Sequence, residues 1–201
     1  SVGEAMAIGR NFQESFQKAL RSLEVGASGL DDVFETHDEA ALNRIREELV
    51  TAREKRIWYV GEALRAGLTQ EEVCRLSGID AWFIEQIAEL VDWEQSIRGS
   101  ALYDIDATRM RALKRLGFAD ARIAALTGAE ELEVRAHRRA LGVRPVYKRV
   151  DTCAAEFPSA TAYLYSSYDE ECEARPSDRR KIMVLGGGPN RIGQGIEFDY
   201  C

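Results

Sequence analysis

The residues best suited to phosphate chemistry lie in a glycine-rich stretch near residue 190. Lys181 and the apolar run 182–185 (IMVL) lead into 186–195 (GGGPNRIGQG), a pattern typical of a buried strand followed by a tight turn. A phosphate-binding P-loop also needs a lysine and a hydroxyl, and Gln194 and Gly195 stand in their places. The dinucleotide fingerprint needs a third glycine where this sequence has Arg191. Neither nucleotide motif is met, so the stretch predicts only a strand and a turn at which backbone can closely approach a ligand or another loop.

Side chains that bind metals are few and far apart. The sequence contains four cysteines and two histidines: Cys74, Cys153, Cys172, Cys201, His37 and His137. They form no C-x-x-C pair and no recognisable zinc pattern, so we expect no metal site. Four unpaired cysteines without a secretory signal are typical of a reducing compartment, which predicts a cytoplasmic location.

The composition is that of a folded, soluble chain whose charge is unevenly distributed. Hydrophobic residues make up 45% and charged residues 30% of the 201 residues, and apolar runs are short, so we expect no membrane span. The formal net charge of −7 argues against a nucleic-acid partner. Residues 27–100 carry a balance of −8 and residues 101–150 a balance of +5. This asymmetry reflects either two solvated helical faces or opposite charges that bring two parts, or two subunits, together.

A helical pattern covers residues 11–24 and then almost all of residues 38–142. Within 11–24 apolar residues recur at three- and four-residue steps, and Asn11 can cap this helix. Asp38 and Asp80 are placed to cap two later helices, and no proline occurs before Pro145. The helix after Asp80 places on or near one side Trp82, Phe83, Ile87, Leu90 and Ile97. These features predict a mainly α fold.

An internal repeat at a shift of 50 residues lies within this helical region. RAGLTQEEVCRLSGI (65–79) aligns with RLGFADARIAALTGA (115–129), and both indicate a helix end, a glycine turn, a short helix, a glycine stop and a next helix. Helix-turn-helix modules share this pattern, which raises the question of DNA binding. The helix after the first copy, 80–94, carries five acidic residues and no Lys or Arg, which is unsuited to a phosphate-lined groove. Two copies of a small helical packing unit are the better interpretation.

The pattern changes after Arg144. Residues 161–168 (TAYLYSSY) alternate and predict an extended segment, whose tyrosines are better explained as core or interface than as a ligand platform. The acidic stretch 169–180, which contains Pro176, is typical of a linker.

Three stretches of the chain resemble the large chain of the carbamoyl-phosphate synthase family. Residues 1–26 (SVGEAMAIGRNFQESFQKALRSLEVG) resemble the end of its first ATP-grasp half. Residues 145–174 (PVYKRVDTCAAEFPSATAYLYSSYDEECEA) resemble the segment that joins its helical domain to the second half. Residues 184–201 (VLGGGPNRIGQGIEFDYC) resemble the start of that second half.

The resemblance implies a helical oligomerisation domain joined to short parts of two flanking α/β ATP-grasp halves. Residues 1–26 would end the first (carboxyphosphate) half, 27–150 would form the oligomerisation domain, 151–177 would connect, and 178–201 would be the incomplete start of the second (carbamoyl phosphate) half. The whole enzyme would be a cytoplasmic ligase that makes carbamoyl phosphate, for pyrimidine and arginine biosynthesis, from bicarbonate, two ATP and ammonia. A small glutamine amidotransferase subunit would supply the ammonia, and magnesium (or manganese) and potassium would be cofactors.

The same resemblance implies that this stretch is inactive by itself, without catalytic, cofactor or metal residues, because the ATP sites lie in the ATP-grasp bodies. Its expected role is the self-association of large chains into homo-oligomers, without a nucleic-acid or membrane partner. Asn190, Arg191, Gly195 and Glu197 match a loop that contributes to the wall of a carbamate tunnel, where a glycine leaves the bore open. The alternative is an independent helical binding module built on the helix-turn-helix-like repeats.

Five aromatic residues of the helical region could serve an association interface: Trp58, Tyr59, Trp82, Phe83 and Trp93. Each is better explained as core, because a helical domain of this length needs bulky residues to fill its interior.

Overall fold

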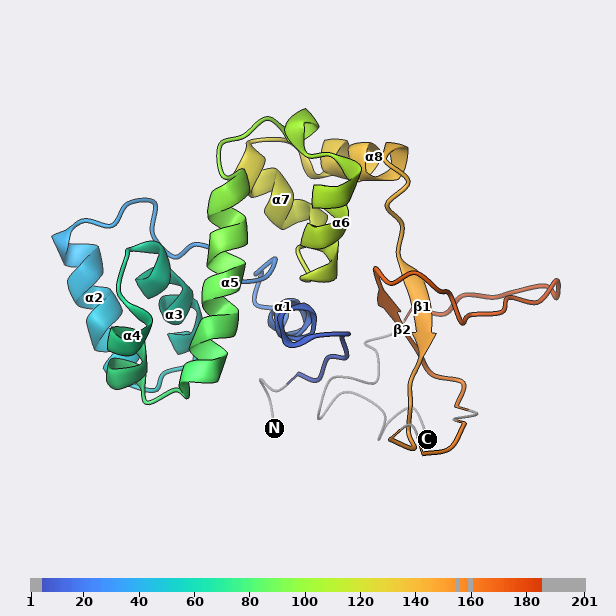
Figure 1. Ribbon diagram of the computed structural model, residues 1–201, viewed down its shortest axis with the longest axis horizontal. Coiled ribbons are helices and arrows are strands. Elements are labelled where there is room, and N and C mark those ends of the chain that lie inside the picture. The colour runs from blue at the N-terminus through green and yellow to red at the C-terminus, as the bar shows by residue number, and fades with distance from the viewer. Residues whose placement is uncertain (1–4, 155, 159–160, 186–201) are drawn as a thin grey trace.

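The structure, a computed structural model, describes residues 5–154, 156–158 and 161–185 (Figure 1). This part of the chain contains eight α-helices and one two-stranded antiparallel sheet, so the prediction of a mainly α fold is confirmed. The helices are α1 (Phe12–Ser22), α2 (Glu39–Val50), α3 (Arg56–Arg65), α4 (Gln70–Ser77), α5 (Ala81–Ile97), α6 (Ala107–Arg115), α7 (Asp120–Thr127) and α8 (Glu131–Ala140), with a 3₁₀ turn at Leu102–Asp104. The strands β1 (Val146–Arg149) and β2 (Leu164–Ser167) pair with Val146 opposite Ser167, which confirms an extended segment within 161–168.

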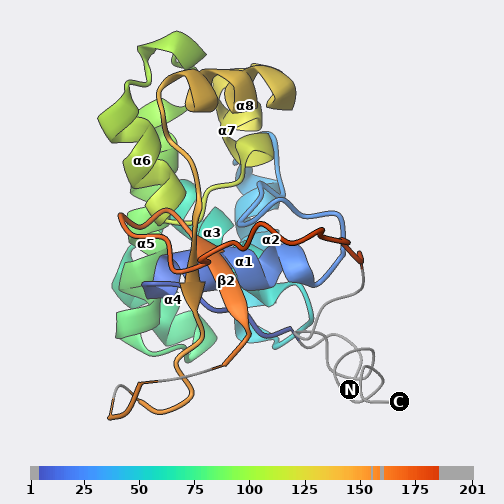
Figure 2. The same ribbon diagram turned by 90° about the vertical axis from the view of Figure 1, so that its right-hand side faces the viewer.

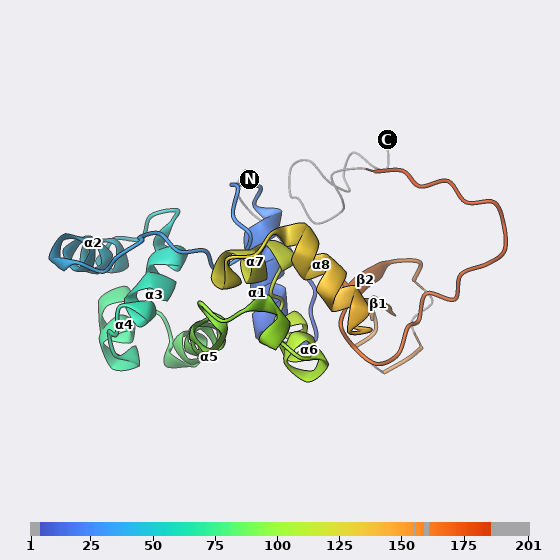
Figure 3. The same cartoon turned by 90° about the horizontal axis from the view of Figure 1, so that it is seen from above.

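The helices form two units on either side of α5. Helices α2 to α4 make up the first helical unit and α6 to α8 the second, as Figure 1 shows from the front and Figure 3 from above. Each unit has its own apolar core, and α5 contributes to both. Ile84, Ile87 and Val91 pack into the first core, whereas Leu90 and Ile97 pack into the second. The helix α5 is therefore the shared wall between the two cores.

The first helix and the hairpin complete the structure. The helix α1 lies beside α5, and the hairpin of β1 and β2 passes across it in Figure 2. Asn11, Asp38 and Asp80 cap their helices as predicted, each side chain accepting a hydrogen bond from a backbone N–H of the first turn. These caps explain why α1, α2 and α5 begin where they do.

The internal repeat is confirmed in three dimensions. Gly67 and Gly117 both end a helix in the left-handed region, with φ of +85° and +87°, and Gly78 and Gly128 follow with +68° and +69°. The residue after the first glycine of each copy donates its N–H to the carbonyl five residues earlier, at 3.0 and 3.1 Å. This is the backbone pattern of a Schellman turn, which requires a residue with positive φ and therefore favours glycine.

Candidate functional site: a charged seam and an aromatic patch

Six charged side chains gather where α3, α5 and α7 meet, and we call them the seam cluster: Asp32, Glu62, Arg65, Glu94, Arg98 and Arg122. Glu94 of α5 lies at its centre and is 1% exposed. Its carboxylate binds Arg65 of the first unit at 2.8 Å and Arg122 of the second unit at 2.9 Å. One buried carboxylate therefore joins a guanidinium from each of the two helical units.

The outer part of the seam cluster balances these charges. Asp32 accepts from Arg122 and from Arg98, both at 2.8 Å, and Glu62 binds Arg65 at 2.7 Å. Burial alone would raise the pKa of Asp32, but the hydrogen bonds and positive charges of Arg122, Arg65 and Arg98 outweigh it and lower the pKa to about 2. Three carboxylates thus face three guanidiniums.

The seam cluster fixes how the two units pack. A buried, fully paired charge cluster adds little net stability over apolar residues, but removing one partner is costly because a buried charge is left unpaired. The sequence alone did not single out these residues, because the bonds that join Glu94 to Arg65 and Arg122, and Asp32 to Arg122, connect positions 28 to 90 apart. We infer that the cluster holds α7 against α3 and α5, a structural task.

A second buried cluster ties the second unit to the hairpin. The ammonium of Lys114, a side chain only 6% exposed, donates to Asp120 at 2.9 Å and lies 5.2 Å from the ring centre of Tyr168. Burial lowers the pKa of Lys114 to about 8, despite the opposing effect of Asp120. Arg138 of α8 also binds Asp120, at 2.8 Å. Because Arg138 is buried and paired, it is not available to a nucleic-acid phosphate.

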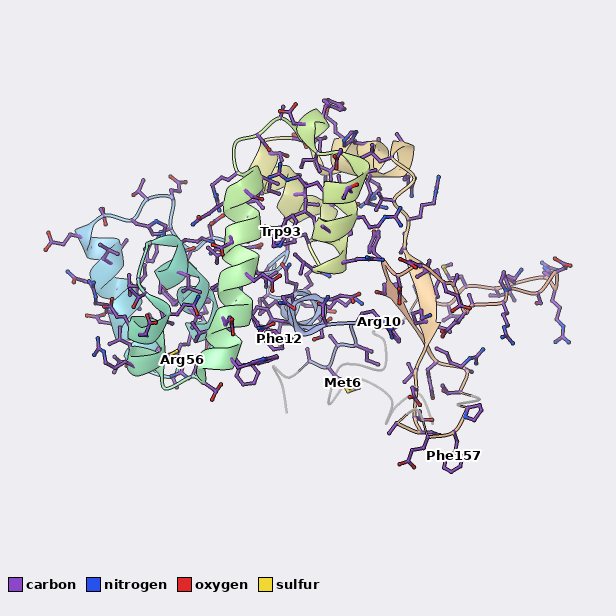
Figure 4. All side chains as sticks on the ribbon, viewed as in Figure 1. Met6, Arg10, Phe12, Arg56, Trp93 and Phe157 are labelled. Atoms are coloured by element: carbon purple, nitrogen blue, oxygen red, sulfur yellow. The ribbon has the colours of Figure 1, made fainter. Side chains whose placement is uncertain are left out.

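The aromatic residues that the sequence assigned to the core fall into two groups. Trp58 is 8% exposed and donates to the Gly29 carbonyl at 3.0 Å, so its core assignment is confirmed. Tyr59 is half-buried against Phe34, and Trp93 lies on the side of α5 that faces the second core (Figure 4). All three pack within the molecule.

For Trp82 and Phe83 the core prediction is wrong. They are 50% and 43% exposed, because Ile84 and Ile87 occupy the core-facing side of α5. Together with Phe12 of α1 they form an aromatic patch, with ring centres 5.0 to 5.5 Å apart. Figure 4 shows Phe12 beside the N-terminal end of α5. Contiguous exposed apolar side chains of this kind mark contact surfaces.

A cleft of about 450 Å³ lies between residues 8–10 and the hairpin. Two of its cations bind carboxylates: Arg10 binds Asp169 at 3.0 Å and Lys148 binds Glu173 at 2.7 Å. The third, Arg149, donates to the backbone carbonyl of Thr161. Most of the positive charge of the cleft is therefore already neutralised. Among the described residues, no three His, Cys, Asp or Glu side chains gather as a metal site. None of the helices in this part of the chain is long and apolar enough to cross a bilayer.

The family is decided by a match over most of the helical region. The family model described as "Carbamoyl-phosphate synthetase large chain, oligomerisation domain" matches residues 4–142. The chain belongs to this family. The model "Carbamoyl phosphate synthase preATP-grasp domain" matches residues 178–201. The match to the oligomerisation domain includes α1, which we expected from the sequence to belong to the preceding half. The domain limits given above remain a prediction.

Relatives match along the whole chain. The carbamoyl phosphate synthase large chain of Pseudomonas aeruginosa is 59% identical over 201 residues, which are 100% of this chain and 19% of the relative. Those of Vibrio cholerae and Xanthomonas campestris are 58% and 60% identical, again over 100% of this chain and 19% of the relative. The chain spans about a fifth of the length of these relatives.

The glycine-rich loop candidates remain predictions. Asn190, Arg191, Gly195 and Glu197 lie outside the described residues, within the segment that matches the preATP-grasp domain. The comparisons support the oligomerisation domain of a carbamoyl phosphate synthase large chain rather than an independent helix-turn-helix-like binding module.

Proposed function

We propose that this chain is the association region of a carbamoyl phosphate synthase large chain, and that it links the two synthetase halves. The parent would be a cytoplasmic ligase that makes carbamoyl phosphate from bicarbonate, two ATP and ammonia, for pyrimidine and arginine biosynthesis. The ammonia would come from a small glutamine amidotransferase subunit. The match of residues 4–142 to the oligomerisation domain carries this proposal.

In this proposal the described residues take no part in phosphoryl transfer. Phosphoryl transfer needs groups that cradle phosphates and carboxylates that hold magnesium. The carboxylates of the seam cluster face arginines instead, at 2.7 to 2.9 Å. ATP, magnesium (or manganese) and potassium would therefore bind the parent outside this region, and the chain alone would be inactive.

Self-association is tested by measuring the mass of the chain in solution. Light scattering over a concentration series, at low and high salt, should show a dimer or larger species. Weakening by salt would implicate the acidic 27–100 and basic 101–150 segments, because screening shortens the reach of exposed charges. A monomer at every concentration and salt would contradict the proposal that this chain carries the association surface.

The aromatic patch is the surface to alter in that measurement. Replacing Trp82 and Phe83 by serine removes exposed apolar area without touching either core. If copies of the chain meet at the patch, the double variant should shift toward the monomer. An equivalent change at exposed Tyr103, which is 72% exposed on the 3₁₀ turn, is the matched control. An unchanged mass in the double variant would exclude the patch as the contact between copies.

The carbamate-tunnel assignment is tested in a full-length large chain. Changing Gly195 to Phe would fill the bore that a glycine leaves open. The expected result is ATP hydrolysis that no longer yields a matching amount of carbamoyl phosphate. Unchanged carbamoyl phosphate output would refute the assignment of Asn190, Arg191, Gly195 and Glu197 to the tunnel wall.

A further inference from the structure

The segment that enters α1 and the strand that leaves the second unit meet at one buried carboxylate. Glu14 of α1 is 1% exposed. Its Oε2 accepts the backbone N–H of Arg10 at 2.7 Å, and the hydroxyl of Ser167 donates to the same oxygen at 3.3 Å. Arg10 precedes α1, whereas Ser167 ends β2, 153 residues after Glu14. One side chain therefore bonds to the segment that enters the helical region and to the strand that leaves it, which we call the two connections.

Lys18, one turn further along α1, completes the junction. Its ammonium donates to Glu14 at 2.7 Å, to the carbonyl of Ile8 at 2.9 Å and to the carbonyl of Ser166 at 2.6 Å. An ammonium has three N–H donors, and here each has its own partner. The partners belong to the entering segment, to α1 and to β2. We call Glu14 and Lys18 the junction pair.

The junction pair differs from the other contact between these segments. Arg10 also binds Asp169 at 3.0 Å, but those side chains are 54% and 26% exposed. Exposed ion pairs contribute little and are screened by salt. Figure 4 shows Arg10 on the side of α1 that faces the hairpin, so this outer contact lies next to the buried one. In the junction pair, by contrast, the side chain of Glu14 is 2% exposed and that of Lys18 is 20% exposed, so its carboxylate is shielded from water.

The chemistry of the junction pair favours a role in geometry. A buried ion pair gains little stability over well-packed apolar residues of the same volume. Hydrogen bonds, however, require narrow distances and angles, whereas the hydrophobic effect is non-directional. Four hydrogen bonds join these two side chains to both connections: Glu14 accepts from the Arg10 N–H and the Ser167 hydroxyl, and Lys18 donates to two backbone carbonyls. They fix the separation of the connections more tightly than apolar packing would.

We propose that Glu14 and Lys18 are positioning residues that hold the two connections of the helical region at a fixed separation. In a longer large chain, the two synthetase halves joined through these connections then keep one relative placement. This consequence rests on the proposed function, in which the halves must cooperate. The fixed separation itself is a property of the present chain.

The separation is tested on this chain with spin labels. Cysteines introduced at Met6 and Tyr163, which are 53% and 49% exposed, carry the labels, and the native cysteines are replaced by serine. The test variant is Glu14→Gln with Lys18→Met, which removes both charges of the junction pair and leaves neither unpaired. Pulsed electron paramagnetic resonance then gives the distribution of distances between the labels.

The control is another buried glutamate, far from the junction. Glu48 of α2 is 3% exposed and binds Arg44 and Arg53, both at 2.6 Å. The wild type and Glu48→Gln should show one narrow distribution, and the double variant one about twofold broader, because its connections lose their directional hydrogen bonds. Circular dichroism checks that the total helical content is unchanged. A double variant that folds and keeps the narrow distribution overturns the proposal. If the double variant loses its helical signal, Ser167→Ala replaces it as the test variant, because this change removes one hydrogen bond and leaves both charges paired. An unchanged distance distribution in Ser167→Ala would equally overturn the proposal.

The consequence for the parent is tested in a chimera. This chain replaces the matching segment of the Pseudomonas aeruginosa large chain, with which it is 59% identical. The ATP consumed per carbamoyl phosphate formed should be normal in the chimera and in its Glu48→Gln form. It should rise about twofold or more in the double variant, because small misplacements between reacting sites are costly. A chimera without carbamoyl phosphate synthesis contradicts the proposed function, whereas an active chimera whose double variant keeps the normal ratio contradicts the positioning role.

Discussion

Replacing Gly117 by alanine should loosen α1 from the second helical unit, and Gly67 provides the matched control. Both glycines close the same kind of turn, with φ of +87° and +85°. A Cβ at Gly117 would lie 2.9 Å from Cα and 3.1 Å from the carbonyl oxygen of Glu14, which are backbone atoms of α1. At Gly67 nothing lies within 4 Å of that position. The two alanine variants therefore share the backbone strain but differ in the clash.

The magnitude follows from that difference. Left-handed backbone costs a non-glycine residue about 1–2 kcal/mol, and this cost applies equally at both turns. The clash at Gly117 adds an overpacking cost of about 1–3 kcal/mol. Pushing α1 away also strains the hydrogen bonds that Gln17 and Arg21 donate to the carbonyls of Leu116 and Gly117, at 3.0 and 2.7 Å. We expect the free energy of unfolding to fall by about 2 kcal/mol more in Gly117→Ala than in Gly67→Ala.

Urea unfolding followed by circular dichroism measures both losses. Hydrogen exchange should locate the extra loss in α1, whose amides should exchange faster in Gly117→Ala alone. Equal losses of unfolding free energy at the two glycines, with α1 equally protected in both variants, would refute the argument that α1 rests directly on the second unit's glycine turn.

The two buried clusters give three further expectations. Arg122→Met should lower the free energy of unfolding by about 3–5 kcal/mol, because Glu94 loses a buried partner. Arg98→Met, at the exposed edge of the seam cluster, should lower it by at most about 1 kcal/mol. Similar losses for the two variants in urea unfolding would contradict this expectation. The folded-state pKa of Lys114 is lowered from 10.5 to about 8, so its charge weakens the fold below pH 8 and this penalty disappears as pH rises to 10.5. Relative to Lys114→Met, the wild type should therefore gain up to about 3 kcal/mol over that window, and a flat difference between the two urea midpoints would be incompatible with a buried ammonium. The pKa of the Asp32 carboxyl is lowered from 3.8 to about 2, so its stabilising contribution is present above pH 3.8 and is lost as pH falls through 2. In Arg122→Met the titration midpoint of Asp32, measured by NMR, should move upward. An unmoved midpoint would exclude Arg122 as a main cause of the lowered pKa.

The local features of the fold could be predicted from the sequence because they depend on residues a few positions apart. Asn11, Asp38 and Asp80 cap helices within their own first turns. The paired glycines of the repeat need positive φ, which their own type permits. The mainly α class followed from the same local signals, summed over 38–142.

The positions of Trp82 and Phe83 show that local sequence signals do not determine which side chains of a helix are buried. Helical spacing placed both near the apolar side of α5, yet Ile84 and Ile87 take the inward positions and leave the two aromatics 50% and 43% exposed. A period of 3.6 residues identifies a face, but α5 is buried on two sides by two cores. Only the packing of the neighbouring helices decides which side chains remain outside.

The sequence by itself therefore determined the helices, their caps, the duplicated glycine turns and the family resemblance. The tertiary structure alone decided that Glu94 joins Arg65 to Arg122, and that Glu14 and Lys18 join the segment before α1 to β2. From the sequence alone, a polar residue on a helix is expected to face solvent, because its distant partners are not known. Burial of such a charge is tolerated only when groups from other segments satisfy it, and those groups meet only once the chain has folded.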